Sequence, residues 1–188
     1  MDKLNEPVLI KDFLDPNRAQ FFHNYACLCH RNKDKFMEAD FNAAGEHKLV
    51  PNYDFSIYSD PLTEILMVEK IPFMEELTGK KLWPTYSYFR MYVHGSELKL
   101  HSDRFSCEYS VTAHWGSDGE PWPITVKGKT FDLKPGEAVI YKGIEWEHFR
   151  EGPYTGDAYS QVFMHYVDKD GLYQDHKFDK RPLIGLKK

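Results

Sequence analysis

The sequence lacks the features that mark a membrane protein or a nucleic-acid binder. No run of apolar residues approaches the roughly 20 that a membrane-spanning helix requires. Positive charge is also scarce, since 24 lysines and arginines stand against 29 aspartates and glutamates, a net charge of -5. This balance argues against a general nucleic-acid or membrane-surface binder. We therefore expect neither nucleic acid nor membrane among the partners.

Cysteine is equally scarce. The three cysteines, Cys27, Cys29 and Cys107, are too few and too scattered for a disulfide framework. Cys27 and Cys29 form a single Cys-x-Cys pair, and we interpret both as ordinary helix residues. Residues 1–7 are polar, with no apolar signal segment. These features predict a cytoplasmic protein.

A chain of 188 residues fits one domain, in which folding buries about two thirds of the unfolded surface. We expect a single domain over residues 1–188 with three parts. Residues 1–81 are expected to supply mainly helical support and loops, and residues 82–168 the strand-rich core. Residues 169–188 are expected to form a solvated C-terminal tail.

Two Asp-Pro pairs predict helix starts in the N-terminal part. Asp15 and Asp60 each precede a proline, as an N-cap precedes a proline in the first helical turn. Apolar residues recur at helical spacing after each: Ala19, Phe22, Ala26 and Cys29 in the first helix, and Leu62, Ile65 and Leu66 in the second. Pro72 is expected either to kink or to end the second helix, and the apolar residues Phe73, Met74 and Leu77 would continue the pattern to a stop at Gly79. Residues 34–58 are expected to loop over the surface.

From Leu82 onward the composition changes to aromatic and β-branched residues suited to strands. Turn signals containing Gly and Pro separate the candidates. The strands are expected near residues 86–93, 97–100, 108–115, 124–126, 130–133, 138–142, 146–150 and 158–167. Helices followed by about eight short strands predict an α+β chain that ends in a double-sheet jelly roll.

The most informative motif is His101-Ser102-Asp103, combined with His148. The tripeptide follows an aromatic strand-like run, and His148 lies in a second strand-like run after a Gly turn. Two imidazoles and one carboxylate on one face of an ion leave three open positions, the arrangement typical of non-haem Fe(II) oxygenases. The combination therefore favours an iron enzyme over a chance His-x-Asp pair at the surface.

With their surroundings, these residues resemble the Fe(II)- and 2-oxoglutarate-dependent dioxygenases, and most closely the prolyl hydroxylases. The matching sequence pattern is Tyr92-x8-His101-x-Asp103, followed by the Pro- and Gly-containing stretch 133–141 and then by Glu147-His148. The resemblance covers roughly residues 83–168. It implies a double-stranded β-helix supported by the N-terminal helices, with His101, Asp103 and His148 as iron ligands. Tyr92 stands where such enzymes usually place a tyrosine that hydrogen-bonds 2-oxoglutarate.

The resemblance also implies an activity. Such an oxidoreductase uses Fe(II), O2 and the cosubstrate 2-oxoglutarate to hydroxylate a C–H bond, releasing succinate and CO2. The substrate is a peptide, with prolyl side chains included, or a small molecule. Fold alone does not fix which.

One part of the family pattern is missing. The family usually has an Arg or Lys about ten residues beyond the distal histidine, and residues 157–161 contain neither. Side chains alternate along a strand, so Arg150 is expected on the same side as His148. Its guanidinium suits a bidentate contact with the distal carboxylate of 2-oxoglutarate. We therefore predict Arg150 as the anchor, with His114 as the second candidate.

The same alternation groups further side chains. One expected strand turns Ser110, Thr112 and His114 to one face, and the last strand does so with Gln161, Phe163 and His165. If these faces line the site, His114 can hydrogen-bond the carboxylate, and His165 lies near the iron or the substrate. Arg104, next to Asp103, is a further candidate for anion binding.

Two other classes of function remain open. A cupin-like metalloenzyme would use the same ligands without 2-oxoglutarate, and the missing downstream base favours it. A non-catalytic jelly-roll binding module would leave the His-x-Asp motif without a role. Iron affinity separates the module from the enzymes, and dependence on 2-oxoglutarate separates the two enzymes.

Overall fold

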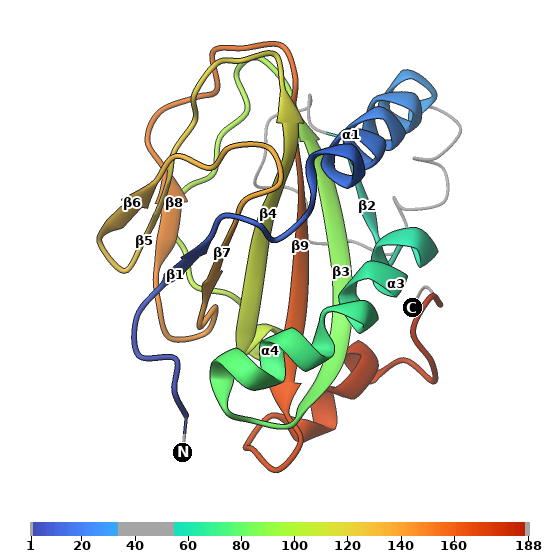
Figure 1. Ribbon diagram of the computed structural model, residues 1–188, viewed down its shortest axis with the longest axis vertical. Coiled ribbons are helices and arrows are strands. Elements are labelled where there is room, and N and C mark those ends of the chain that lie inside the picture. The colour runs from blue at the N-terminus through green and yellow to red at the C-terminus, as the bar shows by residue number, and fades with distance from the viewer. Residues whose placement is uncertain (1, 34–54, 187–188) are drawn as a thin grey trace.

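The computed structural model describes residues 2–33 and 55–186 (Figure 1). Its helices are α1 (Pro16–Arg31), α3 (Pro61–Glu69) and α4 (Ile71–Thr78), with the short 3-10 helices η2 (Phe105–Cys107) and η3 (Gln174–Lys180). Its strands are β1 (Val8–Ile10), β2 (Phe55–Tyr58), β3 (Leu82–Tyr92), β4 (Tyr109–Ser117), β5 (Ile124–Val126), β6 (Lys129–Phe131), β7 (Ala138–Tyr141), β8 (His148–Arg150) and β9 (Tyr159–Asp168).

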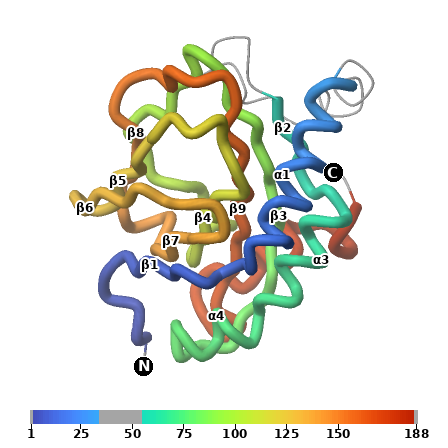
Figure 2. Tube along the Cα trace, turned by 45° about the horizontal axis from the view of Figure 1, so that its top comes forward, coloured from blue at the N-terminus to red at the C-terminus, as the bar shows by residue number. Residues whose placement is uncertain are grey.

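Two antiparallel sheets form the body of the molecule. The larger has the strand order β1-β7-β4-β9-β3-β2 and the smaller the order β6-β5-β8. Helices α1, α3 and α4 pack on β3, β4 and β9, while the smaller sheet lies toward the other side (Figures 1 and 2). The fold is therefore α+β with a jelly-roll core, as the sequence predicts.

Helix α1 forms as its sequence predicts. The Asp15 side chain accepts a hydrogen bond from the Arg18 backbone N–H at 3.0 Å, and Pro16 occupies the first turn. The helix buries the four predicted positions: Ala19, Phe22, Ala26 and Cys29. Phe22 stacks on Trp115 of β4, with ring centroids 4.9 Å apart. The apolar face of α1 thereby covers the outer face of the larger sheet.

Helix α3 starts at the predicted Asp60 cap but turns a different face inward. It buries Thr63, Glu64, Leu66 and Met67, while Ile65 is 64% exposed. The predicted inner position of Ile65 is wrong. The cause is a buried ion pair, because Glu64 Oε1 lies 2.6 Å from Arg181 Nη2. Helix α4 then ends at the predicted Gly79, which has the left-handed φ of 70°.

The predicted surface loop is wrong for its last residues. Residues 34–54 lie outside the described part of the chain, but β2 pairs with β3 along the edge of the larger sheet. Phe55 and Ile57 are buried and alternate with Ser56 and Tyr58. This is the period-two pattern of a half-buried strand, over a segment too short to stand out.

No strand is assigned at residues 97–100, where one is predicted. The segment nevertheless runs beside β8. The Arg150 N–H donates to the Leu98 carbonyl at 2.9 Å, and His101 forms an isolated antiparallel bridge with His148. It thus extends the smaller sheet past β8 and delivers His101 to the site. The other predicted strands correspond to β3 to β9 with shifted ends.

The prediction of a solvated C-terminal tail is wrong for two charged residues. Asp179 is 1% exposed and Arg181 is 5% exposed. Each has a polar partner, the half-buried Tyr58 for Asp179 and the buried Glu64 for Arg181, which compensates the loss of water. None of the described helices has the length and apolar character needed to cross a membrane.

The register of β4 and β9 sets the character of the inner face, the side of the larger sheet turned toward the smaller one. Three direct pairs, Ser110↔His165, Thr112↔Phe163 and His114↔Gln161, lie on this face. The alternate residues, such as Val111 and Met164, join the core on the helix side. Both predicted groups of side chains therefore share one face, and most of its members are polar.

Candidate metal centre

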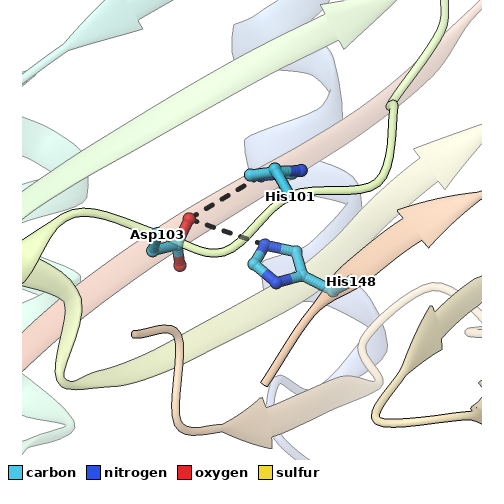
Figure 3. A group of neighbouring side chains, drawn as sticks. All are labelled: His101, Asp103 and His148. Carbon is cyan, nitrogen blue, oxygen red and sulfur yellow. Dashed lines mark ion pairs between the residues drawn. The ribbon is translucent and has the colours of Figure 1, made fainter. Parts of the chain in front are cut away.

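Two neighbouring residues, His101 and Asp103, meet the distant His148 at one end of the inner face. His101 and Asp103 lie in the segment before η2, and His148 is the first residue of β8. Asp103 Oδ1 lies 3.7 Å from His101 Nε2 and 3.5 Å from His148 Nε2 (Figure 3). One ligand atom from each residue falls within 4.8 Å of the others. This is the set that the sequence predicts as iron ligands.

Backbone pairing brings the two imidazoles together. The His148 N–H donates to the His101 carbonyl at 2.9 Å, and the His101 N–H donates to the His148 carbonyl at 3.2 Å. Residues paired in this way carry their side chains on the same face. The two ring centroids are accordingly 4.2 Å apart.

The same local contact orients each imidazole. His101 Nδ1 lies 2.7 Å from the Lys99 carbonyl oxygen, and His148 Nδ1 lies 3.0 Å from the Trp146 carbonyl oxygen. A carbonyl oxygen only accepts, so Nδ1 carries the proton and donates. Each Nε2 is then left with a lone pair toward the centre. Metal-binding histidines typically use one nitrogen for the metal and the other for such a hydrogen bond.

Asp103 is fixed at both its backbone and its carboxylate. Its N–H donates to the Gly143 carbonyl at 2.8 Å, and Oδ2 accepts from Ser110 Oγ at 3.1 Å. A Cβ at position 143 would overlap Asp103 Oδ2 and Ser110 Oγ. The close approach of the two chain segments therefore requires glycine at this position.

The protonation states suit a metal ion. Burial of Asp103 opposes its ionisation, but the electrostatic influence of the nearby rings of His148, His165 and His101 outweighs it and lowers the carboxyl pKa to about 2. Burial, reinforced by His148, lowers the pKa of His101. At neutral pH Asp103 is therefore a carboxylate and His101 a neutral imidazole, the forms that bind metals. The residues present fit a divalent metal ion.

Arg150 lies two residues beyond His148 on β8. It is 4% exposed, and Nη2 donates to Gln161 Oε1 at 2.7 Å. Its guanidinium carbon is 4.6 Å from the Trp122 ring centre and 4.8 Å from that of Tyr159. Within the described residues, Arg150 Nε and Nη1 are buried without a hydrogen-bond partner. Buried donors of a charged group are costly to leave unfilled, so this end of the face fits a carboxylate ligand.

The other predicted cosubstrate residues gather around Arg150. Gln161 Nε2 lies 3.5 Å from the Tyr92 hydroxyl, and His114 stacks on Tyr159 with ring centroids 4.0 Å apart. His114 Nδ1 lies 3.1 Å from the Ser160 carbonyl oxygen. Burial, with Arg150 nearby, lowers the pKa of His114 to about 3, which keeps its ring neutral. Its contact with a ligand stays a prediction.

Two further predicted residues have other partners. Arg104 Nη2 lies 2.9 Å from Asp179 Oδ2, and its guanidinium stacks over Tyr86 at 4.4 Å. His165 Nδ1 lies 2.9 Å from Ser110 Oγ. His165 therefore reaches Asp103 through Ser110, since the same hydroxyl contacts the Asp103 carboxylate.

Sequence reasoning missed Arg90. This residue of β3 pairs with Gln161 of β9, is 6% exposed, and holds its guanidinium carbon 5.2 Å from the Tyr92 ring centre. Its signal was available, because Arg90 lies two residues before Tyr92 in the same strand and therefore shares its face. Gly143 gave no such signal. Ser110 was predicted on the inner face, but its contact with Asp103, like that of Gly143, depends on tertiary packing.

No protein-family model and no curated protein matches this sequence. Solved structures are similar in fold. A Pseudomonas putida prolyl-4-hydroxylase has a TM-score of 0.61 at 14% identity, covering 86% of this chain and 92% of that chain. EctD from S. alaskensis, in its apoform, has a TM-score of 0.65 at 15% identity, covering 95% and 78%. SnoK, a non-heme alpha ketoglutarate dependent carbocyclase from nogalamycin biosynthesis, has 0.67 at 12%, covering 95% and 87%. The chain thus has the jelly-roll fold found in oxygenases of the 2-oxoglutarate- and Fe(II)-dependent kind.

Proposed function

We propose that this chain is an Fe(II)- and 2-oxoglutarate-dependent dioxygenase that hydroxylates a C–H bond of a peptide or small-molecule substrate. The observation that carries the proposal is the convergence of His101, Asp103 and His148, with both Nδ1 atoms bonded away from the centre. Two nitrogens and one oxygen leave open positions on a metal ion, unlike a closed structural zinc site.

The chain itself would orient the ligands and limit access to the centre. When bound, Fe(II) would supply coordination sites for the cosubstrate and O2 and the redox chemistry of their reaction. Gly143 holds the Asp103 backbone N–H, and Ser110 holds its carboxylate. The His101 side chain is 40% exposed whereas that of His148 is 4% exposed. A substrate would therefore approach past His101.

Arg150 would anchor the distal carboxylate of 2-oxoglutarate. Residues two apart on a strand are separated by about 7 Å, so His148 and Arg150 can hold the two ends of a short diacid. Gln161 fixes one side of the guanidinium, and the rings of Trp122 and Tyr159 lie against its carbon. These contacts exclude water and leave two donor nitrogens, Nε and Nη1, for the ligand. This arrangement replaces the base that the sequence lacks at residues 157–161.

An anaerobic titration tests the proposal. Apoprotein receives Fe(II) and then 2-oxoglutarate, and the weak visible band of a chelated keto acid is followed. We expect the band in the wild type and in the controls His94→Ala and Arg18→Ala, which remove an exposed histidine and an arginine paired with Glu69 rather than residues of the centre. It should be absent in His101→Ala and in Arg150→Ala.

Each other result has a defined meaning. A band lost only in His101→Ala would keep the enzyme class and move the anchor to Arg90 or His114. Iron binding without any band would favour a cupin-like enzyme that does not use 2-oxoglutarate. Failure of the wild type to bind iron would overturn the metal centre and favour a binding module.

A further inference from the structure

Asp179 is a buried carboxylate in η3, which packs on β3 and β9 of the larger sheet. It accepts hydrogen bonds from Ser106 Oγ at 2.5 Å and Arg104 Nη2 at 2.9 Å, and from the Tyr58 hydroxyl. Burial and Asp179 raise the pKa of Tyr58, which keeps its hydroxyl a donor. Three donors, one of them charged, compensate the burial of this carboxylate.

Two of these donors belong to the loop that carries the proposed ligand Asp103. Arg104 is the next residue along the chain, and Ser106 lies in η2. Both β3 and η3 bind this loop. On the β3 side, Thr85 Oγ1 donates to the Ser106 carbonyl at 2.7 Å. On the η3 side, His176 Nδ1 also contacts Ser106 Oγ at 2.9 Å.

The loop leads directly to the Asp103 carboxylate. The Cys107 N–H donates to the Arg104 carbonyl at 2.9 Å, closing a turn between the two. The Cys107 carbonyl oxygen lies 3.3 Å from Ser110 Oγ, the hydroxyl that contacts Asp103 Oδ2 at 3.1 Å. A shift of residues 104–107 would therefore disturb the Asp103 carboxylate in two ways, through the chain at Arg104 and through the contact of Cys107 with Ser110.

The backbone of η3 is held in an unfavourable conformation at this point. Phe178, Asp179 and Lys180 have φ values of 54°, 55° and 62°, in the left-handed region that non-glycine residues seldom adopt. Such strain persists only where surrounding contacts determine it. Here Arg181 supplies them, since it donates to the Phe178 carbonyl at 2.7 Å and pairs with buried Glu64.

We propose that Asp179 is a positioning residue for the metal ligand Asp103, acting through Arg104 and Ser106. By binding both, Asp179 fixes the 103–107 loop so that the Asp103 carboxylate faces His101 and His148. The inference rests on the proposed metal centre. Because linkage is reciprocal, a bound metal ion must also stabilise the folded conformation of η3.

The test compares two isosteric changes in the same segment. Asp179→Asn removes the charge that pairs with Arg104, and asparagine tolerates the left-handed backbone. The control is Asp175→Asn, because Asp175 has a 68% exposed side chain and pairs only with His176 and Lys180 among the described residues. The measurements are the Fe(II) dissociation constant, the melting temperature of the apoprotein, and amide hydrogen exchange of residues 174–181 with and without metal.

We expect Asp179→Asn to weaken Fe(II) binding by about 10- to 100-fold, as changes behind a metal ligand typically do. The Asp175→Asn variant should bind as the wild type does. Fe(II) should slow amide exchange in η3 of the wild type and of the control, and this protection should be lost in Asp179→Asn. A lower apoprotein melting temperature with unchanged Fe(II) affinity would overturn the positioning role.

The outcomes also separate this inference from the proposed function. If the wild type fails to bind Fe(II), both the proposed function and the positioning role of Asp179 are wrong. If the wild type and Asp179→Asn bind Fe(II) equally well, only the positioning role is wrong. If Asp179→Asn does not fold, Ser106→Ala and Tyr58→Phe replace it. Ser106→Ala removes a link to the loop and should weaken Fe(II) binding, whereas Tyr58→Phe leaves both loop contacts and should not. Equal Fe(II) affinities in these two variants would overturn the proposal.

Discussion

The two ends of the inner face are built differently. At the metal end, His101 and His148 are oriented by carbonyls two residues before them, and the centre carries one carboxylate. At the other end, Arg150 is oriented by Gln161 of a distant strand and by aromatic rings. The imidazoles of the metal end are thus oriented by local backbone contacts, whereas the guanidinium at the Arg150 end, called the carboxylate end because it would bind a carboxylate ligand, is oriented by packing between the sheets.

The four histidines of the two sheets illustrate the same contrast. His101 and His148 have Nε2 atoms near Asp103 Oδ1, whereas His114 and His165 are enclosed by the larger sheet. Burial lowers the pKa of His165 to about 4 and, with Arg150, that of His114 to about 3. A lowered pKa is therefore common to His101, His114 and His165. Only the directions of the nitrogen atoms distinguish the proposed ligands.

The largest expected effect comes from removing a ligand at the metal end, which leaves the Arg150 end intact. Asp103→Ala should lower Fe(II) affinity by more than about 100-fold, beyond the loss typical of residues behind a ligand, and abolish turnover. The fold should persist, because no apolar core is removed. Anaerobic titration and circular dichroism measure the two effects, with exposed Asp132→Ala as control. Turnover retained by Asp103→Ala would rule out its assignment as a ligand.

The second prediction tests the geometry of the metal end without removing a ligand. Gly143→Ala should destabilise the protein by about 1–3 kcal/mol, since the added methyl overlaps neighbouring atoms, and should weaken Fe(II) binding. Gly171→Ala is the matched control, because its Cβ would meet Asp168, a residue outside the metal set. Urea unfolding and Fe(II) titration compare them. Equal Fe(II) affinities in the two variants would contradict the role given to Gly143.

The third prediction concerns the carboxylate end and pH. His114 has a pKa near 3 in the folded protein and about 6.5 when unfolded, so between these values the unfolded chain binds more protons. Its contribution is present above pH 6.5 and is lost as pH falls toward 3. Folding stability should decrease by about 2 kcal/mol between pH 7 and pH 5 through this residue.

Chemical unfolding at both pH values measures this contribution. The decrease should shrink by that amount in His114→Gln and stay unchanged in the exposed-residue control His94→Gln. The same pH dependence in His114→Gln as in the wild type would contradict the prediction.

The smallest expected effect comes from a change beside Arg150 that leaves the metal end intact. Gln161→Leu removes the acceptor that orients the guanidinium, a loss of about 1 kcal/mol that corresponds to roughly 5-fold weaker 2-oxoglutarate binding. Fe(II) affinity should not change. Isothermal titration of the metal-loaded protein measures both. A Gln161→Leu variant that loses Fe(II) instead would show that the two ends are not independent.

Local patterns in the sequence predicted much of this protein. The Asp15-Pro16 start and the spacing of Ala19 and Phe22 determine α1, because caps and periodicity act within a few residues. The spacing of His101 and Asp103 put both in one extended segment, and strand alternation put Arg150 beside His148. The α+β class and jelly-roll core followed from the order of such segments.

Tertiary structure alone decided the rest. The face of α3 that carries Glu64 is buried because Arg181, 117 residues later, supplies the charge partner of Glu64. Asp179 is buried for the same reason, and the proximity of Gly143 to Asp103 arises only when the sheets assemble. Polar contacts between distant segments have no periodicity in the sequence. They depend on which buried groups can satisfy one another, and only the folded chain settles that.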